Sequence, residues 1–182
     1  HAMHVAKLSL RLFDQLRAVH GLGEADRELL LASTILHDIG GFISIDRHHK
    51  HSMYLILSTG IKGFDSRSVN LIANIARYHR KAEPSLRHAS FARLPEADRN
   101  RVTKLSAILR LADGLDPDHR HRVYDLRATV REGAIHLALE GSAELPLVRT
   151  AVRKKSKLFC RVFGARLSVS GISYEREDYG TR

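Results

Sequence analysis

A histidine followed directly by an aspartate, His37-Asp38, closes an apolar stretch and offers the clearest chemistry in this sequence. Neighbouring residues on a helix point about 100° apart, so both side chains can reach one ion only near a helix end. An imidazole and a carboxylate together suit a borderline divalent ion such as Mn, Fe, Zn or Co. Because such a pair also arises by chance, the alternative is a helix C-terminal histidine held by a carboxylate.

Two side chains far from this pair in the sequence could complete a metal site. His4 lies on the preceding helical segment, and Asp113 is followed by Gly114, a small residue that lets the carboxylate approach a buried ion. Considered alone, His4 could be an exposed helix residue and Asp113 could cap the next turn. We predict that His4, His37, Asp38 and Asp113 bind the ion. We also predict catalytic roles for His37, Asp38 and Asp116, with Asp116 or a nearby histidine assisting proton transfer.

Two clusters that mix cations with imidazoles follow the His-Asp pair. Such side chains bind phosphate oxygens through charge-assisted hydrogen bonds. The predicted substrate-phosphate residues are His48, His49, Lys50, His51, Arg77, His79, Arg80 and Lys81. Their histidines could instead hold a second ion, or both clusters could be solvated basic loops. No glycine-rich loop of the Walker type is present, and Cys160 beside Phe159 is expected in the core.

The elements that must position these residues are mostly helices. Apolar residues at helical spacing predict helices near residues 1–16, 24–38, 51–58, 66–79 and 96–113. After Pro117 the pattern changes: strands are expected over 123–130, around 135–139 and over 167–169, with a helix over 145–163. The predicted fold class is therefore mainly α, with a helical domain over residues 1–122 and a small ββαβ (α+β) unit over 123–182.

Composition narrows the partners. Hydrophobic residues make up 43% and charged residues 27% of the chain, which is typical of a globular protein. The formal net charge of +10 suits a polyanion such as polyphosphate or a nucleotide phosphate, although a basic solvated surface is the alternative. Aromatic residues are only 6% and tryptophan is absent, so nucleic acid is an unlikely partner. The single cysteine and the lack of a long apolar run predict a cytoplasmic location and no membrane partner.

The order of the four predicted ligands, a histidine, the His-Asp pair and a later aspartate, resembles that of the HD superfamily. Longer stretches resemble the C-terminal HD region of the exopolyphosphatase and guanosine pentaphosphate phosphohydrolase (Ppx/GppA) family. They are His1-Ala2-Met3-His4-Val5-Ala6 through Leu12-Phe13-Asp14-Gln15-Leu16, Leu36-His37-Asp38-Ile39-Gly40, His48-His49-Lys50-His51-Ser52, Ala76-Arg77-Tyr78-His79-Arg80-Lys81 and Leu109-Arg110-Leu111-Ala112-Asp113-Gly114-Leu115-Asp116. The resemblance covers about residues 1–122, and the remaining residues resemble the small final domain of the family more loosely.

This resemblance implies an HD-type fold and a divalent ion, with Mn, Mg, Fe, Zn and Co not distinguished. It also implies that phosphoanhydride hydrolysis in the family belongs to two N-terminal domains of the actin-like ATPase type, which no part of this chain resembles. The chain is then either a fragment of such a protein or a free-standing relative. Two hypotheses follow: a metal-dependent phosphohydrolase that uses its own HD site, or a non-catalytic module that binds polyphosphate and forms a homodimer.

Overall fold

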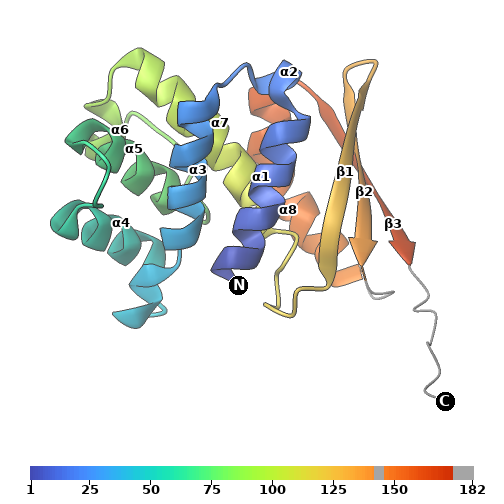
Figure 1. Ribbon diagram of the computed structural model, residues 1–182, viewed down its shortest axis with the longest axis horizontal. Helices are drawn as coiled ribbons and strands as arrows, with labels where there is room; N and C mark the ends of the chain where they lie inside the picture. The colour runs from blue at the N-terminus through green and yellow to red at the C-terminus, as the bar shows by residue number, and fades with distance from the viewer. Residues whose placement is uncertain (142–145, 174–182) are drawn as a thin grey trace.

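The computed structural model describes residues 1–141 and 146–173 and places a helical layer beside a small sheet (Figure 1). The helices are α1 (Ala2–Gln15), α2 (Arg17–His20), α3 (Glu24–Leu36), the 3₁₀ helix η1 (Ile39–Phe42), α4 (His48–Thr59), α5 (Ser66–Arg77), α6 (Ala89–Ala92), α7 (Glu96–Asp113) and α8 (Pro146–Phe163). The strands are β1 (Val123–Arg131), β2 (Ala134–Gly141) and β3 (Arg166–Ser173). No helix within the described ranges is both long and apolar enough to cross a bilayer.

The helical layer is held together by α1, α3, α5 and α7, which pack on one another. In α1 the side chains of Val5, Leu8 and Leu12 recur at helical spacing and are fully buried. Burial of such a side chain stabilises the fold by roughly 1.5–3 kcal/mol. The central helix α7 buries most of its last three turns, so its final residue Asp113 is delivered into the interior.

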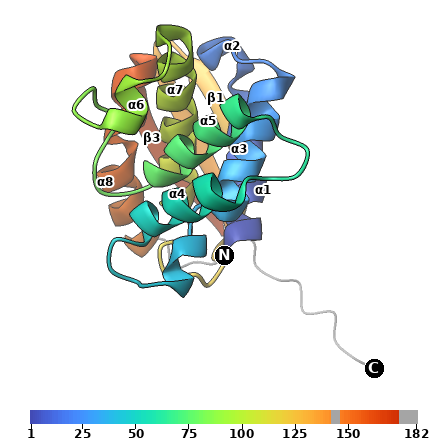
Figure 2. The ribbon, with the colours of Figure 1, turned by 90° about the vertical axis from the view of Figure 1, so that its left-hand side faces the viewer.

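The three strands form one mixed sheet. The β1 and β2 strands are antiparallel, whereas β2 and β3 are parallel and joined through α8. Ile135, Leu137 and Leu139 alternate along β2 and point into the core, while His136 lies on the outer face beside Ser168. Viewed from the helical side, the sheet lies behind α7 (Figure 2).

The structure confirms the predicted fold class, because a mainly helical part is followed by strands and a helix in ββαβ order. The division at residue 122 stays a prediction: buried residues of α1, α7, β1 and α8 belong to one continuous hydrophobic core. Helix α4 begins at His48, earlier than expected, and the polar loop after α5 contains the short helix α6. Leu145 and residues 174–182 of the expected C-terminal unit lie outside the described residues.

His37 and Asp38 stand at a helix end, which is where both side chains of such a pair can reach one ion. Helix α3 ends at Leu36, His37 stands at its C-cap, and Asp38 is the N-cap of η1. The turn between α3 and η1 therefore lets both side chains point to one place. Gly40 in η1 lies against the backbone of α4, where a Cβ atom would collide with the backbone of His48 and Ser52.

Candidate metal centre

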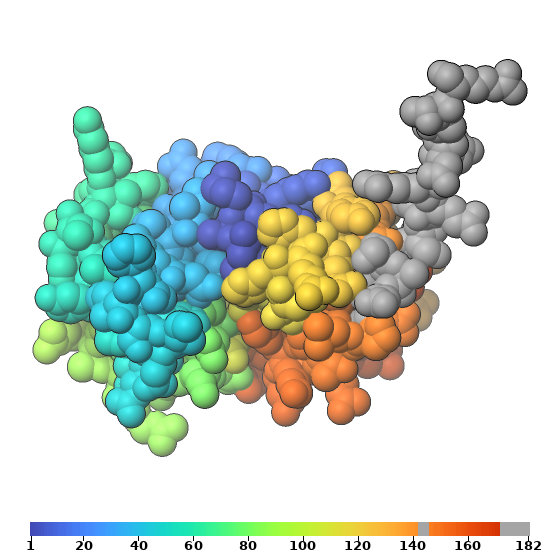
Figure 3. All heavy atoms as spheres, turned by 90° about the horizontal axis from the view of Figure 1, so that it is seen from below, coloured from blue at the N-terminus to red at the C-terminus, as the bar shows by residue number. Residues whose placement is uncertain are grey.

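The centre is built around Asp38, whose two carboxylate oxygens face different sets of histidines. One group of potential ligands contains His1, His37 and Asp38, and the other contains Asp38, His48 and His79. In each group the ligand atoms lie within 4.8 Å of one another. The N-terminal residues, the segment after α3 and the loop after α7 gather on one face of the molecule (Figure 3).

The first group lies on the Oδ2 side of Asp38. His37 Nε2 is 3.4 Å and His1 Nε2 is 3.8 Å from this oxygen. Asp113 Oδ1 closes the group, at 3.4 Å from His1 Nε2 and 4.0 Å from His37 Nε2. Two imidazoles and two carboxylates, each offering one atom, form a donor set that suits a divalent transition metal.

The second group lies on the Oδ1 side of Asp38. His48 Nε2 is 3.1 Å and His79 Nε2 is 3.3 Å from this oxygen, and the two ring nitrogens are themselves 3.1 Å apart. Asp38 would therefore bridge two neighbouring ions. The sequence left open whether His48 and His79 bind phosphate or a second ion, and this arrangement favours the ion.

The Nδ1 atoms of His37, His48 and His79 fix the orientation of these three rings. His37 Nδ1 lies 2.6 Å from Thr34 O, and the Nδ1 atoms of His79 and His48 lie 2.8 and 3.1 Å from the carbonyl oxygens of Ala76 and Ile45. A carbonyl oxygen only accepts, so in these three rings Nδ1 carries the proton and donates it. Each Nε2 then presents its lone pair to Asp38, which is how metal-ligating histidines are usually held.

This arrangement leaves polar atoms that require a cation. His48 Nε2 and His79 Nε2 face each other and Asp38 Oδ1, and in the tautomers assigned above neither nitrogen carries a proton, although Arg80 Nη1 lies 3.3 Å from His48 Nε2. His1 Nε2, His37 Nε2 and Asp38 Oδ1 are buried and make no hydrogen bond. Unsatisfied buried groups are costly unless an ion or water completes them. The residues therefore fit one or two divalent ions.

Burial keeps the imidazoles of His37 and His79 neutral, the state in which a histidine binds metal. Burial lowers the pKa of His37 to about 4, against a smaller opposing effect of Asp38. Burial likewise holds the pKa of His79 well below its usual value. His49 lies beside His48 and His79. Burial, and then the neighbouring His48 and Arg80, lower the pKa of His49 to about 4.

The lowered pKa of His37 predicts that the metal-free protein loses stability as the pH falls from about 6.5 to about 4. In this window the unfolded chain binds a proton that the folded chain refuses, so acid favours unfolding. The effect for His37 alone is on the order of 3 kcal/mol. Urea unfolding at pH 7, 6 and 5 in the presence of EDTA measures it. The slope should flatten in His37→Gln and persist in His136→Gln, and an equal slope in both variants would contradict the assignment.

His1 takes the place in the cluster that was predicted for His4. The His4 ring stacks on His121 with a centroid separation of 4.4 Å, and its contacts do not include Asp38 or Asp113 among the described residues. His1 is the N-cap of α1 and His4 lies in its first turn, and the sequence does not say which of them faces the cluster. That His4 binds an ion stays a prediction, but the geometry favours His1.

Asp116 lies behind the cluster. Its side chain is completely buried, Oδ2 lies 2.8 Å from His1 Nδ1, and Oδ1 accepts a hydrogen bond from the backbone N–H of His121. His119 stacks on the other side of the His1 ring at 3.7 Å. A carboxylate in this position orients the imidazole. The catalytic role predicted for Asp116 is untested, and its geometry suits a positioning role.

The cluster opens into a pocket of about 880 Å³. The pocket lining includes four of the predicted phosphate residues: His48, His79, Arg80 and Lys81. Of the remaining predicted residues, Arg77 donates to Met53 Sδ, and His49, Lys50 and His51 are not part of the lining found within the described ranges. Arg110 also lines the pocket, but its guanidinium donates to the carbonyl oxygens of Tyr78 and Ala82 and so anchors the loop that carries Arg80.

Lys155 was not among the residues predicted from the sequence, and its ammonium contacts Asp113 Oδ2. Burial and the nearby Arg110 and Arg80 lower the pKa of this lysine to about 8. A signal was available, because Val148, Val152, Lys155 and Phe159 follow one another at spacings of four, three and four, the spacing of an inward-facing helix stripe. A charged side chain within an apolar stripe indicates that it pairs with a buried group of opposite charge.

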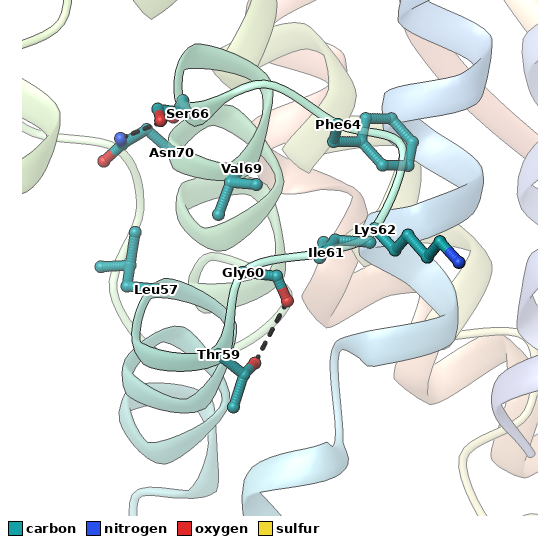
Figure 4. Close-up of a pocket in the computed structure, with 9 residues that line it drawn as sticks. All are labelled: Leu57, Thr59, Gly60, Ile61, Lys62, Phe64, Ser66, Val69 and Asn70. Atoms are coloured by element: carbon teal, nitrogen blue, oxygen red, sulfur yellow. Dashed lines mark hydrogen bonds between the residues drawn. The ribbon is translucent and has the colours of Figure 1, made fainter.

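A second hollow lies away from this centre, between the end of α4, the following loop and α5 (Figure 4). The polar groups drawn there are engaged locally: the hydroxyl of Thr59 donates to Gly60 O, and the amide of Asn70 donates to Ser66 O. Lys62 is the one ionisable side chain in the lining found among the described residues. This hollow therefore offers little chemistry beside the histidine–aspartate centre.

The fold and site define a mainly helical α+β domain that carries a histidine–aspartate cluster able to hold divalent ions. Residues 1–154 match the family described as Ppx/GppA phosphatase, domain III, and the chain belongs to this family. It is also 34% identical over 85 residues to a guanosine-5'-triphosphate,3'-diphosphate pyrophosphatase of Pseudoalteromonas translucida (strain TAC 125). That match covers 43% of this chain and 16% of the relative. Family membership confirms the predicted resemblance and indicates a phosphatase-related role.

Proposed function

We propose that this chain is an HD-type domain that binds one or two divalent ions and hydrolyses phosphoanhydride or phosphoester bonds of nucleotides or polyphosphate. The observation that carries the proposal is the placement of Asp38 between two sets of imidazole Nε2 atoms. Two metal ions held close together are typical of many enzymes that act on phosphate groups. A carboxylate that serves both groups of ligands would hold them in this way.

The ions, when bound, would supply positive charge for the phosphate oxygens and acidify a water molecule. The residues of this chain would hold the ions and bind the substrate. His1, His37, Asp38 and Asp113 would hold one ion, and His48, His79 and Asp38 the other. Asp116 would keep the His1 ring in the ligating orientation, and Arg80 at the pocket wall would attract the substrate phosphate.

The surroundings of the centre offer apolar contacts that the base of a nucleotide could make and bare polyphosphate could not. Asp38 also lines an adjoining recess whose other lining residues are Ile39, Phe42 and Leu55. Phe42 is 96% exposed, which is unusual for a large apolar side chain unless a ligand or partner covers it. An organic group such as a base could rest on this recess while its phosphates lie in the adjoining pocket.

The second candidate is a non-catalytic module that binds polyphosphate and forms a homodimer. Two observations favour it: the net charge of +10, and the 16% share of the curated relative that the match covers. Binding of this kind is electrostatic, so the affinity would fall steeply with added salt.

The test is hydrolysis of nucleotide and polyphosphate substrates by the purified protein, with elemental analysis of its metal content. We expect bound transition metal and metal-dependent hydrolysis, both abolished in His37→Ala. The matched control is His136→Ala, which changes an exposed histidine on the outer face of β2. Polyphosphate binding at low salt without hydrolysis would favour the second candidate, and metal-free protein with unchanged background activity would reject the first.

A further inference from the structure

Helix α8 sends one lysine to the candidate metal centre. The ammonium of Lys155 contacts Asp113 Oδ2, the oxygen that faces away from His1 and His37. Its stem runs along Gly114, where a Cβ atom would lie 3.4 Å from both Cβ and Cδ of Lys155. The stem of the lysine therefore packs directly over Gly114 on its way to Asp113.

The surroundings of this ammonium are rich in positive charge. Arg80 and Arg110 are close enough to repel it, while Asp38 attracts it. Arg110 donates to backbone carbonyl oxygens through a terminal guanidinium nitrogen, which holds it against the loop that carries Arg80. Lys155 and Arg80 also line the pocket, where Arg80 Nη1 lies 3.3 Å from His48 Nε2, and the exposed Lys154 and Lys81 complete this set of cations. These cationic side chains around one pocket favour a bound anion there, beside the carboxylates of Asp38, Asp113 and Asp116 that also line it.

We propose that Lys155 is a substrate-binding residue. Together with Arg80, it binds the phosphate group that lies at the histidine–aspartate centre. The proposal rests on the proposed function and names the ligand of the same site as a phosphate with at least two free oxygens. Asp113 holds the ammonium in place before the phosphate arrives. The C-terminal unit is then part of the binding site, since α8 supplies one wall.

Lys155 could alternatively act only by positioning Asp113 as a ligand. The two roles differ in their effect on ion binding. A residue that positions a ligand supports ion affinity, whereas a nearby cation that binds phosphate opposes it by charge repulsion. Ion binding and phosphate binding must therefore be measured separately on the same variants.

The variants are Lys155→Met, Lys155→Arg and the control Lys157→Met, which changes an exposed lysine on the same helix. Titration calorimetry would measure Mn²⁺ binding, and then inorganic phosphate binding in Mn²⁺ and in EDTA. We expect Lys155→Met to lose at least tenfold in phosphate affinity while its Mn²⁺ affinity is equal or higher. Lys155→Arg should keep most of the phosphate affinity, and Lys157→Met should match the wild type.

Two results would overturn the proposal: phosphate affinity that is the same in Lys155→Met and Lys157→Met, or a loss of Mn²⁺ affinity in Lys155→Met. If the wild type bound no Mn²⁺ but bound phosphate through Lys155 in EDTA, the lysine's role would stand and the metal-dependent function would fall. If Mn²⁺ bound equally and phosphate bound without Lys155, the metal-dependent function would stand and the lysine's role would fall. A wild type that binds no phosphate under either condition rejects the proposal.

Discussion

Asp38→Asn is expected to lower the affinity for both ions by about a thousandfold, because each carboxylate oxygen of Asp38 serves a different group of ligands. The amide has nearly the same shape but no charge. A unit charge about 4 Å from an ion is worth roughly 4 kcal/mol at an effective dielectric constant of 20, which corresponds to about three orders of magnitude in affinity. Equilibrium dialysis followed by elemental analysis measures the ions retained.

The comparison variants separate this effect from a general loss of charge. Asp46→Asn removes a carboxylate that is 85% exposed in the same segment and should retain the wild-type ion content. His79→Asn removes a ligand of the second group alone and should cost one ion while sparing the other. Full ion content in Asp38→Asn, or an equal loss in Asp46→Asn, would show that Asp38 does not bridge two ions.

Much of this centre could be predicted because its residues stand at the ends of regular elements. His37 and Asp38 directly follow α3, and Asp113 ends α7, so hydrophobic periodicity locates them and local residue types suggest metal binding. The mainly helical fold followed by a ββαβ unit could be predicted in the same way. Which other side chains meet the ends of these helices depends on long-range packing, and hydrophobic periodicity does not describe such packing.

The remaining residues show where sequence reasoning stops. His1 and His4 lie on the same helix, and the choice between them depends on Asp116, a residue 115 positions away from His1 that holds the His1 ring. The cluster His48-His49-Lys50-His51 carries three imidazoles, but only His48 faces Asp38, because α4 begins there and turns its successors elsewhere. Lys155 lies among other lysines of α8, and only its place in the apolar stripe of that helix sets it apart from Lys154 and Lys157.

Gly40→Ala is expected to destabilise the protein by about 3 kcal/mol and to weaken the second ion site. A Cβ atom at position 40 would collide with the backbone of His48, His51 and Ser52, which a change of side-chain rotamer does not relieve. Overpacking of this kind typically costs about 1–3 kcal/mol, and backbone clashes lie at the upper end. The backbone N–H of Gly40 also donates to Ser52 Oγ, whose hydroxyl donates to His37 O, so η1, α4 and the ligand His37 would move together.

Gly41→Ala provides the matched control, because a Cβ atom there meets nothing within 4 Å. Thermal unfolding should show a fall in Tm of roughly 6–12 °C for Gly40→Ala and almost none for Gly41→Ala. Since the collision pushes His48 away from Asp38, Gly40→Ala should also lose the ion held by His48 and His79 before the one held by His1 and His37. Equal unfolding temperatures in the two variants would mean that η1 can shift without disturbing α4. The second ion site would then not depend on the close approach of these two backbones.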